Sequence, residues 1–225
     1  MMSLVKVKSE SPLVDCVISQ SHQRQNRSVG VVFEELELQT HVNLRCQLTD
    51  ESIQKWVDQV LGVALPTQPN MFVQKQELRV FWLAPDEWLI VTPQAESDLV
   101  EKLDSVLEGV HHAVTALTGG QTVIRITGPA AREVLAQGCT LDLHQTVFGP
   151  NYSAQTLLAH VPVLICLVNG MNREDSIFDV VVRRSFADYL ARWLVDGAVE
   201  YGFRCTFSNA IKPKTFDIDS DVGTR

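Results

Sequence analysis

The segment Gln121–His144 reads QTVIRITGPAAREVLAQGCTLDLH, and it predicts a strand, a tight turn and a short helix. The strand is indicated by a β-branched run that Gly128 ends, namely Val123, Ile124 and Ile126. Pro129 is expected to begin the helix, because proline at the first helical position loses no hydrogen bond. Gly138 fits the left-handed residue that follows many helices. Apolar residues recur between them at helical spacing: Ala131, Val134 and Leu135.

Working outward from this segment, similar patterns occur on both sides. Before it, strands are expected at 42–48, 78–83, 88–91 and 111–117, with helices at 53–61 and 99–107. After it, strands are expected at 156–159, 163–168, 177–182 and 203–207, with a helix at 186–199. The first half follows the order β-α-β-β-α-β, and a comparable order recurs in the second half. The sequence therefore predicts an α+β fold of two pseudo-repeated ferredoxin-like (βαββαβ) halves that share a sheet or a core.

The boundaries of this domain are indicated by composition. Residues 1–28 are expected to form an extended N-terminal arm, because Ser-Glu-Ser-Pro at 9–12 interrupts regular structure. Residues 208–225 are expected to be a tail rich in aspartate. The domain then spans 29–207, with halves at about 29–118 and 119–207 joined near Thr118-Gly119-Gly120. Both ends are candidates for ordering on a partner.

Charge and composition limit the possible partners. The formal net charge is −8 and no basic block occurs, which argues against a nucleic-acid partner. No apolar run approaches the roughly 20 residues of a membrane span, and the start lacks the pattern of a signal peptide. The five cysteines are scattered without a Cys-x-x-Cys motif, which favours reduced thiols in the cytoplasm over disulfides or zinc.

Motifs that would carry catalysis are sparse. The sequence has no glycine-rich dinucleotide or phosphate loop. His111 and His112 are adjacent, so in a strand they would point to opposite faces and could not share a metal ion. Asp142 and His144 could face the same way, as an orienting carboxylate beside an imidazole base, with Cys139 nearby. The alternative is a loop in which Leu141 and Leu143 pack inward.

Three further residues could contact a ligand. Trp82 and Trp88 flank the turn at 84–87, where they could pack in the core, anchor a subunit interface or stack on a flat ligand. Arg183, with Arg184 beside it, could bind a carboxylate, although a solvated strand end is the simpler interpretation.

Several segments resemble the γ subunit family of heterotetrameric sarcosine oxidase. The resemblance extends from about residue 11 to 203 with its motifs in order: Ser-Pro-Leu at 11–13, Ala-Pro-Asp-Glu-Trp-Leu at 84–89, Ile-Thr-Gly-Pro-Ala-Ala-Arg-Glu-Val-Leu at 126–135, Gly-Cys-Thr-Leu-Asp-Leu-His at 138–144, Ala-Gln-Thr at 154–156 and the Phe-Asp-Val to Arg-Ser-Phe stretch at 178–186. It implies a fold like the folate-binding domain of the glycine-cleavage T protein.

The resemblance also implies a function. The complex would oxidatively demethylate sarcosine to glycine and transfer the one-carbon unit to tetrahydrofolate. The α and β subunits would carry NAD, FAD, FMN and the folate site, and the δ subunit would bind zinc. This chain would be an accessory subunit with no catalytic, cofactor or metal residues of its own; any folate contacts would fall on Trp82, Trp88 and Arg183. Alternatives are a stand-alone folate-binding or aminomethyltransferase-like protein, or a γ-type subunit of a related N-methyl amino acid oxidase or dehydrogenase.

Overall fold

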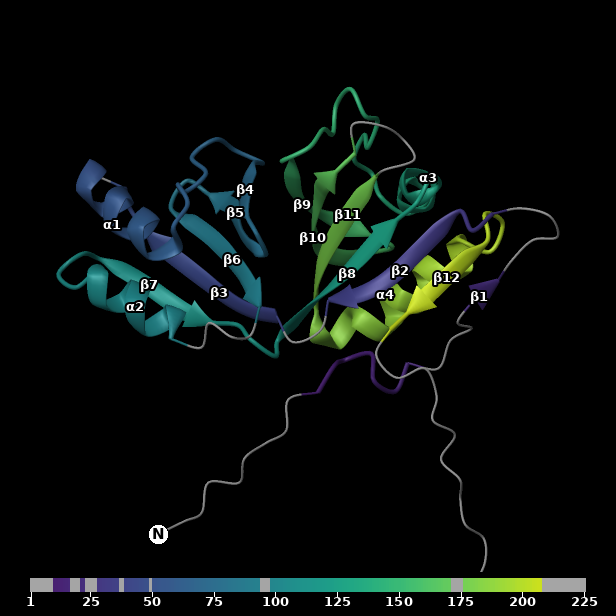
Figure 1. The fold of residues 1–225 in the computed structure, drawn as a ribbon, viewed down its shortest axis with the longest axis horizontal. Helices are drawn as coiled ribbons and strands as arrows, with labels where there is room; N and C mark the ends of the chain where they lie inside the picture. Colours follow the sequence, from purple (N-terminus) through teal and green to yellow (C-terminus); the bar gives the residue numbers. More distant parts are fainter. Residues whose placement is uncertain are drawn as a thin grey trace, which may run out of the picture.

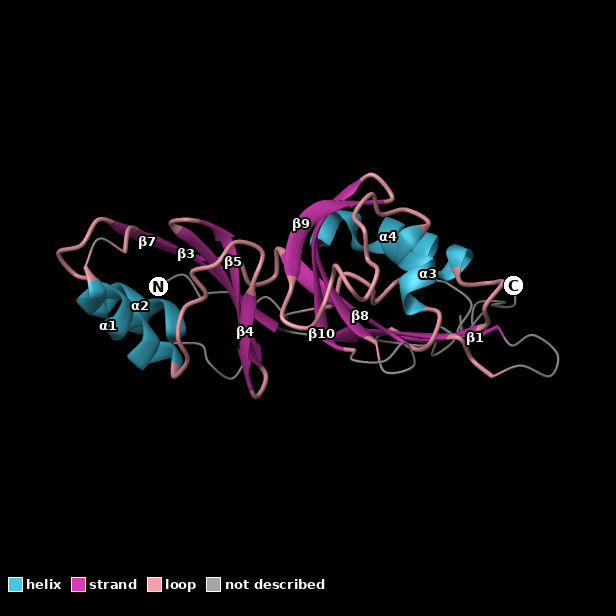
Figure 2. Ribbon diagram, turned by 90° about the horizontal axis from the view of Figure 1, so that it is seen from above, coloured by secondary structure: helices cyan, strands magenta, loops and turns pink. Residues whose placement is uncertain are grey.

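The computed structural model describes residues 10–16, 21–22, 28–36, 39–48, 50–93, 98–170 and 176–207. In these residues the chain forms two β-sheets that lie side by side (Figure 1). Helices α1 and α2 cover one face of the five-stranded sheet, and α3 and α4 cover one face of the seven-stranded sheet (Figure 2). The predicted α+β class is confirmed.

The five-stranded sheet has the order β4-β5-β6-β3-β7 with every pair antiparallel. Its strands are β3 (Gln39–Cys46), β4 (Phe72–Lys75), β5 (Leu78–Ala84), β6 (Glu87–Pro93) and β7 (His112–Ala116). Its helices are α1 (Glu51–Leu61) and α2 (Leu99–Val106). The carboxylate of Asp50 caps α1 by accepting from the Ser52 N–H, and Gly62 ends it with φ +67°. The short edge strand β4 was not predicted, because half of its residues are polar.

The seven-stranded sheet has the order β1-β12-β2-β8-β11-β10-β9. Its strands are β1 (Ser21–His22), β2 (Val31–Leu36), β8 (Gln121–Thr127), β9 (Ser153–Leu158), β10 (Val161–Asn169), β11 (Ile177–Arg183) and β12 (Phe203–Thr206), and its helices are α3 (Ala131–Ala136) and α4 (Arg184–Gly197). Strand β12 runs parallel to β2, and the other neighbours are antiparallel.

Strand β2 does not follow the predicted division of the chain. It precedes the five-stranded sheet in sequence but lies between β12 and β8 of the other sheet. A division of the chain near residue 118 therefore does not divide it into the two sheets, because β2 comes before residue 118 and belongs to the seven-stranded sheet. With β1 and β2 set aside, the remaining strands of both sheets occur in matching order along the chain and across the sheet.

The segment at 121–144 forms the expected strand, turn and helix, with two corrections. The helix begins at Ala131, so Pro129 lies in the preceding turn and not at the first helical position. Gly138 does not adopt a left-handed conformation. A side chain at Gly138 would instead place its Cβ 2.6 Å from the Trp193 ring, so close packing against α4 explains the glycine. Gly128 does have positive φ, +111°.

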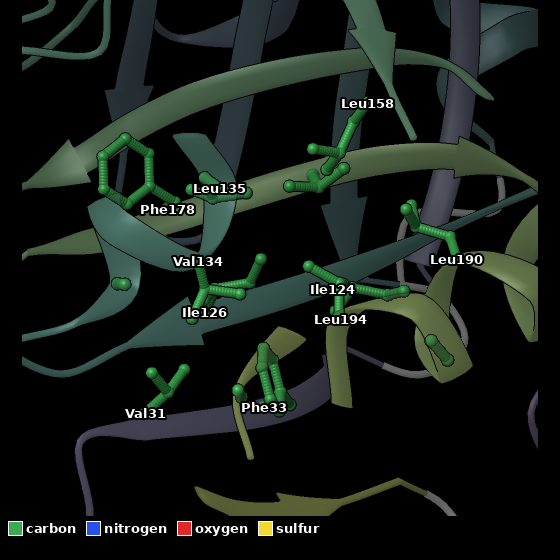
Figure 3. Packing of buried hydrophobic residues seen from close by; sticks show 14 of the residues in the cluster. Val31, Phe33, Ile124, Ile126, Val134, Leu135, Leu158, Phe178, Leu190 and Leu194 are labelled. Carbon is green, nitrogen blue, oxygen red and sulfur yellow. The ribbon is translucent and has the colours of Figure 1, made fainter. Parts of the chain in front are cut away.

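Three apolar cores hold the described residues together. The largest lies between the seven-stranded sheet and its helices, where Figure 3 shows Phe33, Ile124 and Ile126 packed with Val134 and Leu194. A second lies under α1 and α2. The third joins the two sheets, and its buried residues are Phe72, Phe81, Leu89, Val91, Val123, Leu164, Cys166 and Val181. The two halves therefore share a core.

The described parts of the predicted N-terminal arm pack against the seven-stranded half. Leu13 is fully buried in its core, and the Ser11 hydroxyl donates to the buried Glu35 carboxylate. Ser21 and His22 form β1, which pairs with β12. These residues are thus held by this chain itself. The predicted tail at 208–225 lies outside the described residues.

Candidate functional site

A pocket of about 540 Å³ opens between α3 and the loop that follows it. Its wall is mixed, with apolar side chains, one guanidinium and two carboxylates. The lining residues are Arg132, Glu133 and Ala136 from α3, and Cys139, Leu141, Asp142, Leu143, His144 and Gln145 from the loop. The pocket therefore contains the Cys139, Asp142 and His144 that the sequence had singled out.

The loop geometry removes the proposed pairing of Asp142 with an imidazole base. Asp142 Oδ1 accepts a hydrogen bond from the backbone N–H of His144 at 2.9 Å. The His144 ring contacts Thr146 instead, with 2.7 Å between Nδ1 and Oγ1. Leu143 is buried and Leu141 is half-buried, as the loop alternative predicted. Asp142 thus stabilises the loop as an Asx turn.

Arg132 lines this pocket, and sequence reasoning missed it. Its Nη1 donates to the carbonyl oxygen of Leu143 and, at 3.5 Å, to that of Phe148. The guanidinium carbon lies 5.0 Å from the Phe178 ring centroid. Burial lowers the pKa of Arg132. In the part of the chain that the structure describes, Nε and Nη2 are buried and have no hydrogen-bond partner.

The three predicted ligand contacts do not form one site, since both tryptophans belong to the five-stranded half and Arg183 belongs to the other. Trp88 is fully buried in the core under α1 and α2, and its indole N–H donates to the Pro66 carbonyl at 2.8 Å. Trp82 is its cross-strand partner and packs on the same core while partly exposed. Arg183 is exposed at the end of β11 in the other sheet. Core packing therefore accounts for Trp88, and folate contact at Trp82 and Arg183 stays a prediction.

The adjacent histidines have separate surroundings. His112 contacts the Val110 carbonyl and Asp104, and these hydrogen bonds raise its pKa. His111 is exposed. Across the described ranges, no group of three His, Cys, Asp or Glu side chains is arranged to hold a metal ion.

Charged residues meet where the two sheets join. The carboxylate of Asp179 on β11 is fully buried and accepts from Arg125 on β8, at 2.8 Å from Nε and 2.9 Å from Nη2. It also accepts from Arg79, which reaches across from β5 of the other sheet. Arg79 is only 3% exposed. This ion cluster links the sheets beside the third core.

His41 on β3 is another buried titratable group. It is fully buried, and its Nδ1 lies 3.1 Å from the Gln39 carbonyl. Burial, aided by the nearby charge of Arg79, lowers the pKa of His41 to about 4. The imidazole is therefore neutral at physiological pH.

No helix in the described part of the chain is long and apolar enough to cross a membrane. The fold is that of a T-protein-like α+β protein. The structure of glycine cleavage system aminomethyltransferase T from Bartonella henselae superposes with a TM-score of 0.56, covering 80% of this chain and 48% of that one at 15% identity. At this identity the similarity concerns the fold alone.

Sequence comparison identifies the family. The family model of the sarcosine oxidase gamma subunit matches residues 45–200. The sarcosine oxidase subunit gamma of an Arthrobacter species is 33% identical over 173 residues, covering 76% of this chain and 82% of the relative. The corresponding subunit from Corynebacterium sp. (strain P-1) is also 33% identical, covering 64% of this chain and 68% of its own. The chain belongs to the sarcosine oxidase gamma subunit family.

A solved structure agrees with this assignment. A chain of the heterotetrameric sarcosine oxidase from Corynebacterium sp. U-96, in complex with pyrrole 2-carboxylate, superposes with a TM-score of 0.73. The match covers 90% of this chain and 97% of that one at 26% identity. The family resemblance found in the sequence is thus confirmed.

Proposed function

We propose that this chain is an accessory, non-catalytic γ subunit of a flavin-dependent sarcosine oxidase, assembled with α, β and δ subunits. The observation that carries the proposal is its membership of the family, together with a fold that matches 97% of a chain from such a heterotetramer. The complex would demethylate sarcosine to glycine and pass the one-carbon unit to tetrahydrofolate. FAD, FMN, NAD, tetrahydrofolate and zinc would be held by the other subunits.

The contacts of the polar residues support a structural role. Asp142 holds a loop, and Asp179 holds two arginines between the sheets. Trp88 is enclosed in a core. Each of these side chains is thus engaged in maintaining the fold. Substrate choice, sarcosine or a related N-methyl amino acid, would then be decided in the flavin-bearing subunit.

We also interpret the two halves as ferredoxin-like pseudo-repeats. The order β7-β3-β6-β5 is the 4-1-3-2 arrangement of a βαββαβ unit. The order β12-β8-β11-β10 corresponds to it once β2 is removed. Strand β2 would be an insertion that lets the start of the chain close the second sheet.

The distribution of exposed apolar side chains favours docking through the seven-stranded half. Of the seven large apolar residues exposed in the described chain, only Trp56 belongs to the five-stranded half. The other six are Val147, Tyr152, Leu157, Phe186, Tyr189 and Val199. Tyr189 also donates its hydroxyl to the Ala159 carbonyl, which fixes its ring beside the end of β9. An excess of exposed apolar side chains on one half is what a docking surface on that half would require.

All five cysteines are free thiols, which supports a cytoplasmic location. The function is tested by co-expressing this chain with its α, β and δ partners and weighing the purified complex by native mass spectrometry. We expect one copy of each subunit, sarcosine oxidation by the complex and none by this chain alone. Turnover of sarcosine by the isolated chain would refute the non-catalytic role.

A further inference from the structure

Arg125 and Arg132, both in the seven-stranded half, differ in whether the guanidinium edge formed by Nε and Nη2 has a hydrogen-bond acceptor. Arg125 donates from Nε and Nη2 to the two carboxylate oxygens of Asp179, at 2.8 and 2.9 Å. This side-on pair of parallel N–H groups matches the spacing of a carboxylate. In Arg132 the same two atoms are buried and, among the described residues, meet no acceptor. Arg132 therefore has an unused carboxylate-binding edge.

Leaving that edge unused is costly. A buried donor without an acceptor has lost its hydrogen bonds to water, and the loss is larger for a charged group. Arg132 is nevertheless fixed by two loop carbonyls through Nη1 and by the face of the Phe178 ring. The guanidinium is thus held in place on a residue that lines the 540 Å³ pocket.

The rest of the lining limits what could bind there. Two carboxylates, Glu133 and Asp142, line the same pocket and would repel a simple anion. A molecule with both a carboxylate and an ammonium group could place the carboxylate against Arg132 and the ammonium group against the acidic side chains. Apolar surface from Ala136, Leu141 and Leu143 would contact its carbon atoms. The volume lies in the range of small-molecule sites.

We propose that this pocket binds a small amino-acid zwitterion, with its carboxylate on Nε and Nη2 of Arg132 and its ammonium group toward Asp142. Both nitrogens are covered in the structure, so entry requires the side chains around them to move. The ligand is bound without chemical change. The proposal is independent of the subunit role, since it concerns only residues of this chain.

The test is a titration of the full chain followed by amide NMR shifts and calorimetry. The probes are sarcosine as a zwitterion, acetate as a carboxylate alone and methylamine as a cation alone. We expect sarcosine to saturate below about 10 mM, a concentration that fills a site of millimolar Kd. Its shifts should map to α3 and the loop at 139–145. Acetate should bind at least about tenfold more weakly, as loss of a charged hydrogen bond implies.

Variants separate the site from general effects on folding. Arg132→Lys keeps the charge but loses the side-on edge, so affinity for sarcosine should fall about tenfold or more. Ala136→Phe fills the pocket from the exposed face of α3 and should abolish binding without touching the core. Arg192→Lys on α4 is the matched control and should leave affinity unchanged.

Three results would overturn the proposal. One is no saturable shift with sarcosine. Another is equal binding of sarcosine and acetate, which would show a plain anion site. The third is unchanged affinity for sarcosine in both Arg132→Lys and Ala136→Phe, which would place the binding outside this pocket.

Discussion

Replacing Asp179 with asparagine should destabilise the chain far more than any exposed ion pair could. The neutral amide would leave Arg79, which is 3% exposed, and Arg125 without their shared counter-charge. Breaking a buried ion pair by removing one partner costs about 3–5 kcal/mol. Since whole domains are stable by only about 5–15 kcal/mol, this is a large fraction of the total.

The chain offers a matched control in Asp188. Its carboxylate pairs with Arg192 in nearly the same geometry, 2.8 Å from Nε and 3.0 Å from Nη2. Both side chains are about half exposed, and the residues are four apart on α4. Exposed pairs of this kind contribute about 0.3–0.5 kcal/mol. Asp188→Asn should therefore cost much less than Asp179→Asn, because the Asp188 carboxylate is half exposed and pairs with one arginine, whereas the buried Asp179 carboxylate pairs with two.

Urea unfolding of the two variants, followed by circular dichroism and fluorescence, measures the difference. We expect the free energy of unfolding to fall by about 3–5 kcal/mol in Asp179→Asn and by less than about 1 kcal/mol in Asp188→Asn. The double variant Arg79→Met with Asp179→Leu should recover part of the loss, since the apolar pair needs no counter-charge and only Arg125, whose side chain is 28% exposed, is left unpaired. Equal losses in the two single variants would refute the reasoning that burial makes the Asp179 cluster important.

Three further outcomes follow from the same structure. Because His41 has a pKa near 4 when folded and about 6.5 when unfolded, the unfolded state binds more protons between these values. Stability should therefore fall by about 3 kcal/mol as pH drops from 6.5 to 4, and the pH dependence of His41→Gln measured by urea unfolding should be correspondingly flatter. Gly138→Ala should cost about 1–3 kcal/mol through overlap with the Trp193 ring, whereas Gly149→Ala, with no atom nearer than 4.0 Å, should cost little by thermal unfolding. Leu157→Glu should weaken co-purification with the partner subunits while Trp56→Glu leaves it unchanged, and equal effects would contradict docking through the seven-stranded half.

The sequence predicted most helices and strands because their periodicity is local. The helix at 53–61 and the strand-to-helix junction at 128–131 both depend on residues that are neighbours in the chain. Strand β2 was missed because its place between β8 and β12 depends on pairing with residues about 90 and 170 positions away. Periodicity carries no information about such pairing.

The candidate site was predictable only in part. Cys139, Asp142 and His144 do line one pocket, but the sequence could not show that Asp142 would bond a backbone N–H. Arg132 gave no signal, since an arginine on a short helix is usually solvated. Its burial results from Phe178 and the Leu143 carbonyl, which come from other elements. Trp88 was singled out as a possible ligand contact but is buried in the core. The sequence pattern of its strand did not show which face of the sheet the helices would cover.

The proposed role of this chain is to support a sarcosine oxidase complex without performing its chemistry. The most direct measurement is to produce the α, β and δ subunits with and without this chain, and to compare the mass of the complex and its sarcosine oxidation rate. We predict a stable four-subunit assembly with the chain, and a dissociated or rapidly inactivated preparation without it. A three-subunit enzyme with the same activity and the same thermal stability would contradict the account.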